Sequence, residues 1–334
     1  MQAIAEKNLK NLFTQTFTEN VTGFVALPSS GSERRYFRIK SLNNNVIGAF
    51  NKDIKENIAF LTFTNHFEEL SLNVPSLIAF ELDQGIYLLQ DLGDVNLFSL
   101  LFDGEKRLPV SDKVIGYYKQ VLKALIRFQL EGGKNLDYSV CYPRQAFDRQ
   151  SMQWDLNYFK YYFLKLKDIP FDEQKLENDF SSLIDYLLQA PSDYFMYRDF
   201  QARNVMIHKD VPWFIDYQGG RKGPLQYDLA SLLFQAKADL PFELRNELLD
   251  FYLDELEKKI IVERKLFKDF YSGFVLIRTL QVLGAYGFRG YFQRKPHFIE
   301  SVTYAMKNVK WLLGNLSIPI RLPELDRVMK LMLE

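Results

Sequence analysis

Three oxygen-bearing side chains follow one another at a spacing that suits phosphoryl transfer. Asp199 and Asn204 are five residues apart, and Asp216 follows twelve residues after Asn204. An aspartate can accept the proton of an attacking hydroxyl, whereas an asparagine and a second aspartate offer the hard oxygen ligands that magnesium prefers. Phosphoryl transfer chiefly needs an oriented nucleophile and a neutralised triphosphate charge. The pattern therefore predicts Asp199 as a catalytic base, and Asn204 and Asp216 as catalytic residues that also bind magnesium.

The residues around this pattern support the prediction. Short apolar runs at 205–207 and 212–215 are flanked by turn residues, as in a small hairpin that would bring the later aspartate back to the loop. The alternative is a polar turn in which Asp199 and Asn204 cap backbone groups. The downstream Asp216 favours the catalytic interpretation, since a simple turn does not require it.

The segment 197–204, Tyr-Arg-Asp-Phe-Gln-Ala-Arg-Asn, resembles the catalytic loop of the aminoglycoside phosphotransferase and choline kinase superfamily. That loop commonly begins His-Gly-Asp, so Tyr-Arg-Asp departs from it while the aspartate and asparagine keep their places. Residues 88–93 are similar to the hinge of this superfamily, and residues 223–230 to the segment after its metal-binding aspartate. The resemblance spans about residues 29–236, and residues 278–289 extend it. It implies an α+β, protein-kinase-like two-lobe fold, with a small β-rich N-lobe, a larger helical C-lobe and ATP between them.

Several short segments of the sequence are most similar to bacterial cell-wall amino-sugar kinases. They lie at 34–38, 198–204, 223–229 and 282–284. Those kinases phosphorylate N-acetylmuramate or N-acetylglucosamine at the anomeric hydroxyl, so the resemblance implies a sugar acceptor, with ATP as co-substrate and Mg²⁺ as cofactor. Choline, ethanolamine or an aminoglycoside are alternative acceptors. A pseudokinase module that binds nucleotide without turnover is an alternative of another class.

The nucleotide-binding basic residue is not obvious from the sequence. Glu56 matches the helix glutamate that pairs with a nucleotide-binding lysine in the superfamily, but the strand at 46–50 contains no lysine. Arg38 is the candidate substitute, with Lys40 and Lys52 as further candidates. Each of these basic residues could equally be a solvated charge on a strand, and Glu56 a first-turn acid favoured by the helix dipole.

Other nucleotide contacts follow from the resemblance. Ser30, Gly31 and Ser32 form a small-residue loop whose backbone N–H groups could cover phosphates, although an ordinary turn has the same composition. Gln90 and Leu92 lie in the hinge-like segment, and the resemblance implies that they contact the nucleotide.

The acceptor site has four candidate residues: Asp155, Arg203, Gln281 and Arg289. Asp155 lies in an aromatic helical stretch that the family places near the acceptor, while Gln281 and Arg289 lie in the late matching stretch. A structural role, such as surface ion pairing by Arg203, is the alternative for each of them. Asp228 either supports the catalytic loop or caps the helix that follows it.

The elements that must position these residues follow from periodicity and turn signals. Apolar residues at helical spacing predict helices, and apolar runs between turns predict strands. We expect an N-lobe at 1–92, in which Phe60, Phe63, Phe67 and Leu70 share one face of a helix, and a C-lobe at 93–334 that is mainly helical. The expected N-lobe elements are a helix at 1–20, strands at 34–40, 46–50 and 85–90, and a helix at 55–70; the first C-lobe helices are expected at 114–128, 145–166 and 174–189.

Composition limits the partners and the compartment. The 334 residues are 47% hydrophobic and contain 42 basic and 42 acidic residues, which gives no net attraction to nucleic acid or an anionic membrane. Cys141 is the only cysteine, so no intrachain disulfide can form, and the three histidines are too scattered for a zinc signature. No signal peptide or membrane-spanning run is recognised. We expect a cytoplasmic protein with a small-molecule acceptor, and neither nucleic acid nor membrane as partner.

Overall fold

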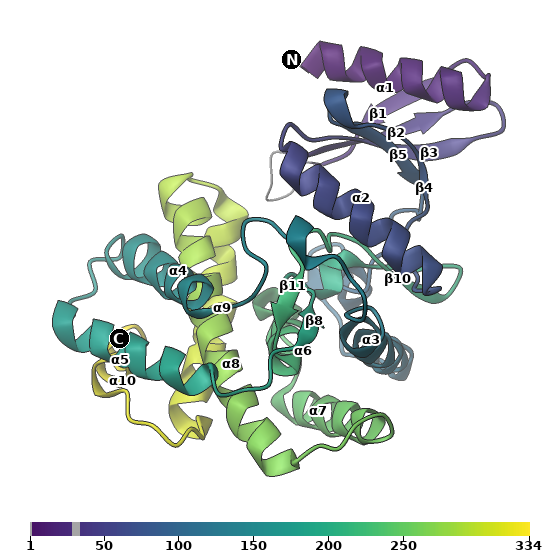
Figure 1. Cartoon of the computed structure of the whole chain (residues 1–334). Coiled ribbons are helices and arrows are strands. Elements are labelled where there is room, and N and C mark those ends of the chain that lie inside the picture. Colours follow the sequence, from purple (N-terminus) through teal and green to yellow (C-terminus); the bar gives the residue numbers. More distant parts are fainter. Residues whose placement is uncertain (1, 29–33) are drawn as a thin grey trace.

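The computed structural model describes residues 2–28 and 34–334, which form two lobes of different architecture (Figure 1). The N-lobe contains a five-stranded antiparallel sheet in the order β1-β2-β3-β5-β4. The C-lobe is mainly helical and surrounds two small two-stranded ribbons, β9-β10 and β8-β11. This arrangement confirms the predicted α+β, kinase-like fold with a small β-rich N-lobe and a larger helical C-lobe.

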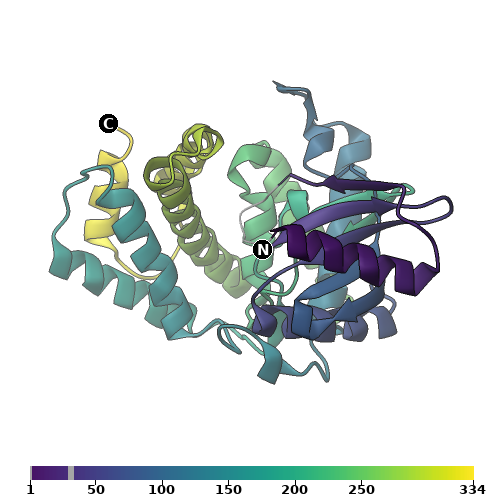
Figure 2. The same ribbon diagram turned by 90° about the horizontal axis from the view of Figure 1, so that it is seen from above.

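The sheet of the N-lobe is covered on both faces (Figures 1 and 2). Its strands are β1 Gly23–Ala26, β2 Arg35–Lys40, β3 Asn45–Phe50, β4 Leu77–Glu81 and β5 Ile86–Gln90, and its helices are α1 Gln2–Phe17 and α2 Ile54–Glu69. Side chains alternate between the two faces of a strand. Leu88 of β5 therefore packs in the cluster that contains Phe13 of α1, whereas Tyr87 packs in the cluster that contains Phe60 of α2.

The helix α2 begins one residue before the start expected from the sequence. Asp53 is the N-cap, and its side chain accepts hydrogen bonds from the backbone N–H groups of Lys55 and Glu56. Phe60, Phe63 and Phe67 are all buried, as the predicted face requires. This helix therefore holds Glu56 at a fixed point in its first turn.

After β5 the chain enters the C-lobe by pairing with the ribbon that carries the site. The backbone N–H of Leu97 donates to the Val205 carbonyl over 2.8 Å, and that of Phe98 donates to the Ala202 carbonyl over 3.1 Å. The lobe boundary predicted after residue 92 lies just before these two hydrogen bonds, and it remains a prediction.

The remaining elements belong to the C-lobe (Figure 1). The helices are α3 Asp112–Leu130, α4 Arg149–Phe159, α5 Glu173–Leu187, α6 Leu225–Leu233, α7 Phe242–Glu257, α8 Arg264–Tyr286, α9 Pro296–Asn315 and α10 Pro323–Leu331. The strands are β6 Phe102–Asp103, β7 Lys106–Arg107, β8 Tyr194–Met196, β9 Val205–His208, β10 Val211–Phe214 and β11 Arg221–Gly223. The helix expected at 145–166 is shorter than predicted, because a π-helical segment, Lys160–Leu164, follows α4.

Helix α8 lies in the middle of the C-lobe and packs against α4, α6 and α9. Its crossing with α4 is close, because a Cβ atom on Gly284 would lie 2.6 Å from the backbone carbon of Tyr158. A methyl group there would require the two helices to separate. Within residues 2–28 and 34–334, no helix has both the length and the apolar character that crossing a bilayer needs.

Candidate active site

The predicted catalytic residues lie in one loop and at the end of the adjacent hairpin. The loop 197–204 leaves β8 and leads into β9, which pairs with β10 so that Val205 lies opposite Phe214. The backbone N–H of Ile215 then donates to the carbonyl of Asn204 over 3.0 Å. This register places Asp216 beside Asn204, as the short apolar runs predicted.

Asn204 links the other two predicted residues. Its Nδ2 donates to the backbone carbonyl of Asp199 over 2.9 Å and to Oδ2 of Asp216 over 3.3 Å. Both donor contacts use the amide nitrogen, and within residues 2–28 and 34–334 the amide oxygen accepts no hydrogen bond, so it can bind another ligand. Asp216 has a φ of 69°, a left-handed conformation that is strained for a residue with a Cβ. The fold thus brings Asp199, Asn204 and Asp216 together in one site.

The charges of this site suit a divalent cation. Burial raises the pKa of the Asp216 carboxyl, and the negative charge of Asp199 raises it further. A cation between the two carboxylates would remove this repulsion, and carboxylate and amide oxygens are ligands that magnesium prefers. Asp216 and Asn204 therefore fit magnesium by their chemistry.

A polar network connects Asp216 to helix α2. Gln218 donates through Nε2 to Oδ1 of Asp216 over 2.9 Å and to Oε1 of Glu56 over 3.2 Å. Asn51 donates to the other oxygen of Glu56 over 2.7 Å. Glu56 also forms an ion pair with Arg34, whose Nη2 lies 3.1 Å from Oε1. The network places the guanidinium of Arg34 on the same side of the site as Asp216.

The sequence-based choice of Arg38 as the partner of Glu56 is wrong. Arg38 lies in β2 and points toward the hinge, where its Nε donates to Asp91 over 2.6 Å and its Nη2 lies 2.9 Å from Asp94. Side chains four residues apart on a strand lie about 13 Å apart along it, so Arg34 and Arg38 serve different ends of the sheet. Lys40, one of the further candidates, is exposed at the end of the same strand.

The other predicted nucleotide contacts divide into two groups. Ser30, Gly31 and Ser32 lie outside the residues that the structure describes. Gln90 is the last residue of β5, and buried Leu92 follows it with its carbonyl 3.2 Å from Nδ1 of His208. These two residues therefore lie where the chain passes from the sheet to the C-lobe.

Asp228, in α6, accepts hydrogen bonds from the start of the catalytic loop. Its two carboxylate oxygens accept hydrogen bonds from the backbone N–H groups of Tyr197 at 2.7 Å and Arg198 at 2.9 Å. The residue lies inside α6, whose N-cap is Pro224, so Asp228 does not cap that helix. Burial raises the pKa of Asp228 to about 7, against the opposing effect of its two backbone hydrogen bonds.

Asp155 is buried and paired with an arginine of the catalytic loop. Its oxygens accept hydrogen bonds from Nη1 and Nη2 of Arg198 at 2.9 and 2.6 Å, and its side chain is only 8% exposed. Arg198 also donates to the hydroxyl of Tyr227 over 2.6 Å and has a φ of 78°. Asp155 thus anchors a strained loop position, and its assignment to the acceptor site stays a prediction.

The other predicted acceptor residues are dispersed. Gln281 accepts a hydrogen bond from Nη1 of Arg278, and the guanidinium of Arg289 lies 5.6 Å from the ring centroid of Phe298. Arg203 is exposed, with its guanidinium 4.5 Å from the ring centroid of Phe98. Of these three residues, Arg203 contacts Phe98, a side chain that lines the cavity described next.

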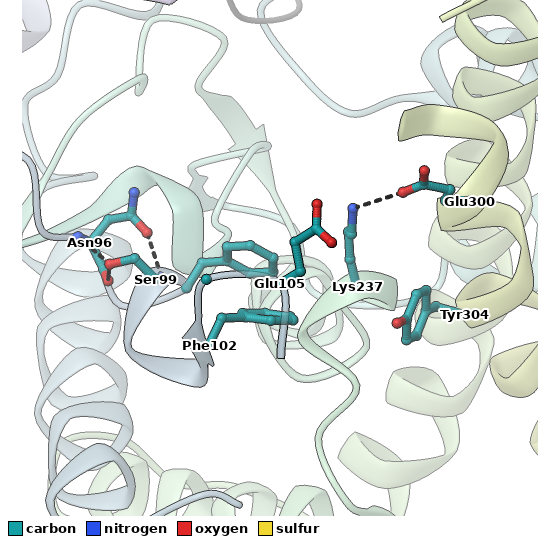
Figure 3. Close-up of a pocket in the computed structure, with 9 residues that line it drawn as sticks. Asn96, Ser99, Phe102, Glu105, Lys237, Glu300 and Tyr304 are labelled. Carbon is teal, nitrogen blue, oxygen red and sulfur yellow. Dashed lines mark hydrogen bonds and ion pairs between the residues drawn. The ribbon is translucent and has the colours of Figure 1, made fainter. Parts of the chain in front are cut away.

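A cavity of about 850 Å³ has the lining drawn in Figure 3. One lining residue, Phe98, donates through its backbone N–H to the carbonyl of Ala202 in the loop 197–204 over 3.1 Å. Its walls come from residues 96–105, from the short helix Ala236–Ala238 and from α9, and Nζ of Lys237 lies 3.6 Å from Glu300 on α9. Aromatic and polar side chains share the lining, which consists of Asn96, Phe98, Ser99, Phe102, Gly104, Glu105, Lys237, Glu300 and Tyr304. The cavity has the mixed lining that small-molecule sites commonly have.

Sequence reasoning missed the site residues whose partners lie on other elements. Arg34 reaches Glu56 from the position just before β2, and Gln218 reaches it from the segment after β10. Arg278 reaches the loop from α8. The arginine pair at 34–35 was a visible signal, since two adjacent strand arginines place one on each face of the sheet. Nothing in the spacing of the residues around Gln218 or Arg278 indicated a role in the site.

Comparison with known proteins agrees with this geometry. Residues 28–262 match the phosphotransferase enzyme family. An N-acetylmuramate/N-acetylglucosamine kinase of Neisseria meningitidis is 25% identical over 287 residues, covering 83% of this chain and 82% of that protein. A protein of the same name from Pseudomonas putida is 24% identical and covers 95% of this chain and 91% of its own length.

Solved structures share the fold. Choline kinase LicA from Streptococcus pneumoniae superposes with a TM-score of 0.61 at 15% identity, covering 93% of this chain and 99% of that one. Aminoglycoside phosphotransferase APH(4)-Ia has a TM-score of 0.58 at 14% identity, with 93% and 98% covered. These likenesses and the family match confirm the predicted superfamily and the prediction of an enzyme. The chain belongs to the phosphotransferase enzyme family, and it is a small-molecule phosphotransferase.

Proposed function

We propose that this enzyme transfers the γ-phosphate of ATP to a hydroxyl of an amino sugar in a magnesium-dependent reaction. The observation that carries the proposal is the convergence of Asp199, Asn204 and Asp216 through the two hydrogen bonds of the Asn204 amide. The similarity to relatives named amino-sugar kinases, over more than four fifths of each chain, supports the choice of acceptor.

Asp199 acts on the acceptor. Its side chain is 48% exposed and can therefore meet a bound hydroxyl group. Asp199 accepts the hydroxyl proton while the acceptor oxygen forms a bond to the γ-phosphorus and the bond from that phosphorus to the β–γ bridging oxygen breaks. ADP leaves with the electron pair of the broken bond, and Asp199 later gives the proton to solvent.

Other residues hold the nucleotide. Asn204 and Asp216 would hold magnesium, which supplies positive charge to the phosphate oxygens when bound. The backbone at Gln90 and Leu92 lies where the hinge would meet the adenine, and Arg34, oriented by Glu56, provides a fixed cation for the phosphates. Arg34 thus takes the role that sequence analysis gave to Arg38.

The cavity beside the loop supports a sugar acceptor. Phe98, Phe102 and Tyr304 offer apolar faces, while Glu105 and Lys237 offer groups that can bond to hydroxyls and amides. Arg203 of the catalytic loop lies with its guanidinium 4.5 Å from the ring centroid of Phe98 in this lining. The acceptor is therefore proposed to occupy this cavity with one hydroxyl directed at Asp199.

A cationic acceptor such as choline is the second candidate. Aromatic rings attract quaternary ammonium groups, and the cavity combines Phe98, Phe102 and Tyr304 with the carboxylates of Glu105 and Glu300. Lys237 in the same lining weakens this candidate, because its ammonium would repel such a ligand.

The test is an ADP-release assay with ATP, with and without magnesium. The acceptors are N-acetylmuramate, N-acetylglucosamine, choline, ethanolamine and an aminoglycoside, and the product is identified by mass spectrometry. We expect magnesium-dependent phosphorylation of the two amino sugars. Preferred turnover of choline would establish the second candidate, and nucleotide binding without turnover of any acceptor would indicate a pseudokinase.

A further inference from the structure

One buried arginine of the C-lobe reaches the catalytic loop from a distant part of the sequence. Arg278 lies in the middle of α8, its side chain is 7% exposed, and its Nη2 lies 3.6 Å from Oδ1 of Asp199. The two residues are 79 positions apart in the chain. Helix packing therefore brings a cation to the proposed base.

The direction of this guanidinium is fixed by two neutral acceptors. Its Nε donates to the hydroxyl of Ser231 on α6 over 3.1 Å, and its Nη1 donates to Oε1 of Gln281, one turn further along α8. A guanidinium is planar, so two fixed nitrogens also fix the third. Nη2 is thereby directed at Asp199.

Asp199 is the carboxylate that forms an ion pair with Arg278. Among the ion pairs of residues 2–28 and 34–334, the one that Arg278 makes is with Asp199. Removing a charge from water is unfavourable unless an opposite charge compensates it, so the buried cation favours an Asp199 rotamer that keeps Oδ1 close. Asp199 itself is about half exposed and would otherwise sample several rotamers.

We propose that Arg278 is a positioning residue, which holds one oxygen of Asp199 so that the other oxygen faces the acceptor hydroxyl. This inference rests on the proposed role of Asp199 as catalytic base. Gln281, which the sequence predicted to bind the acceptor, contributes to this positioning, because it accepts a hydrogen bond from Arg278 and so orients the guanidinium. The close contact of α8 with α4 at Gly284 keeps the helix from shifting.

The first test compares turnover and acceptor binding in Arg278→Ala. A misplaced base lowers kcat, and a displacement of about 1 Å can reduce rate about 100-fold, so we expect a loss of that order with acceptor KM changed by less than about threefold. Guanidinium ions at tens of millimolar should restore part of the lost turnover, because they can occupy the vacated site. Arg278→Lys keeps the charge without the fork and should retain intermediate turnover.

Arg245→Ala is the matched control. Arg245 is also a buried C-lobe arginine, with its Nε bonded to the Leu240 carbonyl and its Nη1 to Asn308, but it makes no ion pair with the loop within the described residues. We expect lower stability, unchanged kcat at a temperature where the protein is folded, and no rescue by guanidinium. Wild-type kcat in Arg278→Ala, or a loss that Arg245→Ala reproduces and guanidinium does not relieve, would overturn the proposal.

A crystal structure of Arg278→Lys separates this inference from the function itself. If the wild-type enzyme transfers phosphate to no tested acceptor, the proposed function fails, yet the rotamer of Asp199 can still be compared between the two proteins. Movement of the Asp199 carboxylate away from its wild-type position supports positioning by Arg278. An unchanged carboxylate position refutes it.

Discussion

Arg34 and Glu56 form an ion pair of 3.1 Å between the residue before β2 and the first turn of α2. The pairing of Arg35 with Phe50 places Arg34 beside the end of β3, a strand that contains no lysine. The guanidinium is almost fully buried, and its carbon lies 5.5 Å from the ring centroid of Phe60. The cation that pairs with Glu56 thus comes from the residue just before β2 and not from β3.

Replacement of Arg34 tests its proposed role in nucleotide binding. Hydrogen bonds to charged groups contribute about 1.5–3 kcal/mol, so Arg34→Met should raise the KM for ATP by about 10- to 100-fold. Arg38→Met is the control, because Arg38 pairs with Asp91 at the hinge. Initial rates at varied ATP give both values, and a larger effect of Arg38→Met than of Arg34→Met would contradict this assignment.

Replacement of Asp199 tests the proposed base. Asparagine has nearly the same shape and cannot accept the proton, and positioned general bases contribute about 100- to 10,000-fold. Asp199→Asn should therefore lose turnover within that range while nucleotide affinity, measured by calorimetry, changes little. Near-wild-type turnover would reject the mechanism.

The pair of Asp155 and Arg198 tests whether this aspartate serves stability or the acceptor. Burial alone would lower the pKa of Arg198, but the charge of Asp155 outweighs it and the pKa is raised. Removal of one partner of a buried ion pair destabilises a protein by about 3–5 kcal/mol, so Asp155→Asn should reduce the free energy of unfolding on that scale.

Urea denaturation of Asp155→Asn, Arg198→Met and the double variant measures this effect. The double variant should lose less than the sum of the single losses, because it leaves no unpaired charge. A higher acceptor KM with unchanged stability in Asp155→Asn would instead restore the acceptor-binding role that sequence analysis proposed.

Asp228 should make stability depend on pH. Its folded-state pKa of about 7 lies above the ordinary value of 3.8, so the folded protein binds the proton more tightly than the unfolded chain does. The stabilising contribution of this proton is complete below pH 4 and is lost as pH rises to about 7, at up to about 1.4 kcal/mol per pH unit.

The comparison with Asp228→Asn isolates this contribution, since the other titrating groups cancel in the difference. The advantage in unfolding free energy of wild type over Asp228→Asn should decrease between about pH 5 and pH 7. Urea denaturation at both pH values provides the measurement. An advantage that does not decrease over this range would show that the folded-state pKa of Asp228 is not raised.

Local spacing in the sequence determined which residues form the candidate catalytic set. Asn204 and Asp216 flank one short hairpin, and the register of β9 with β10 brings them together wherever that hairpin lies. Helix α2 was predictable for a similar reason, because helical spacing places Phe60, Phe63 and Phe67 on one face and Asp53 caps its first turn. Short-range geometry is a property of the chain itself.

Partners from distant elements were decided by the tertiary structure alone. Arg34 rather than Arg38 meets Glu56, Asp155 meets Arg198, and Arg278 meets Asp199. Each pairing depends on how a strand or helix packs against another. A charged side chain has the same local sequence signal whether it ends in solvent, in a buried ion pair or in a site, because the packing that decides among these involves residues far away in the chain.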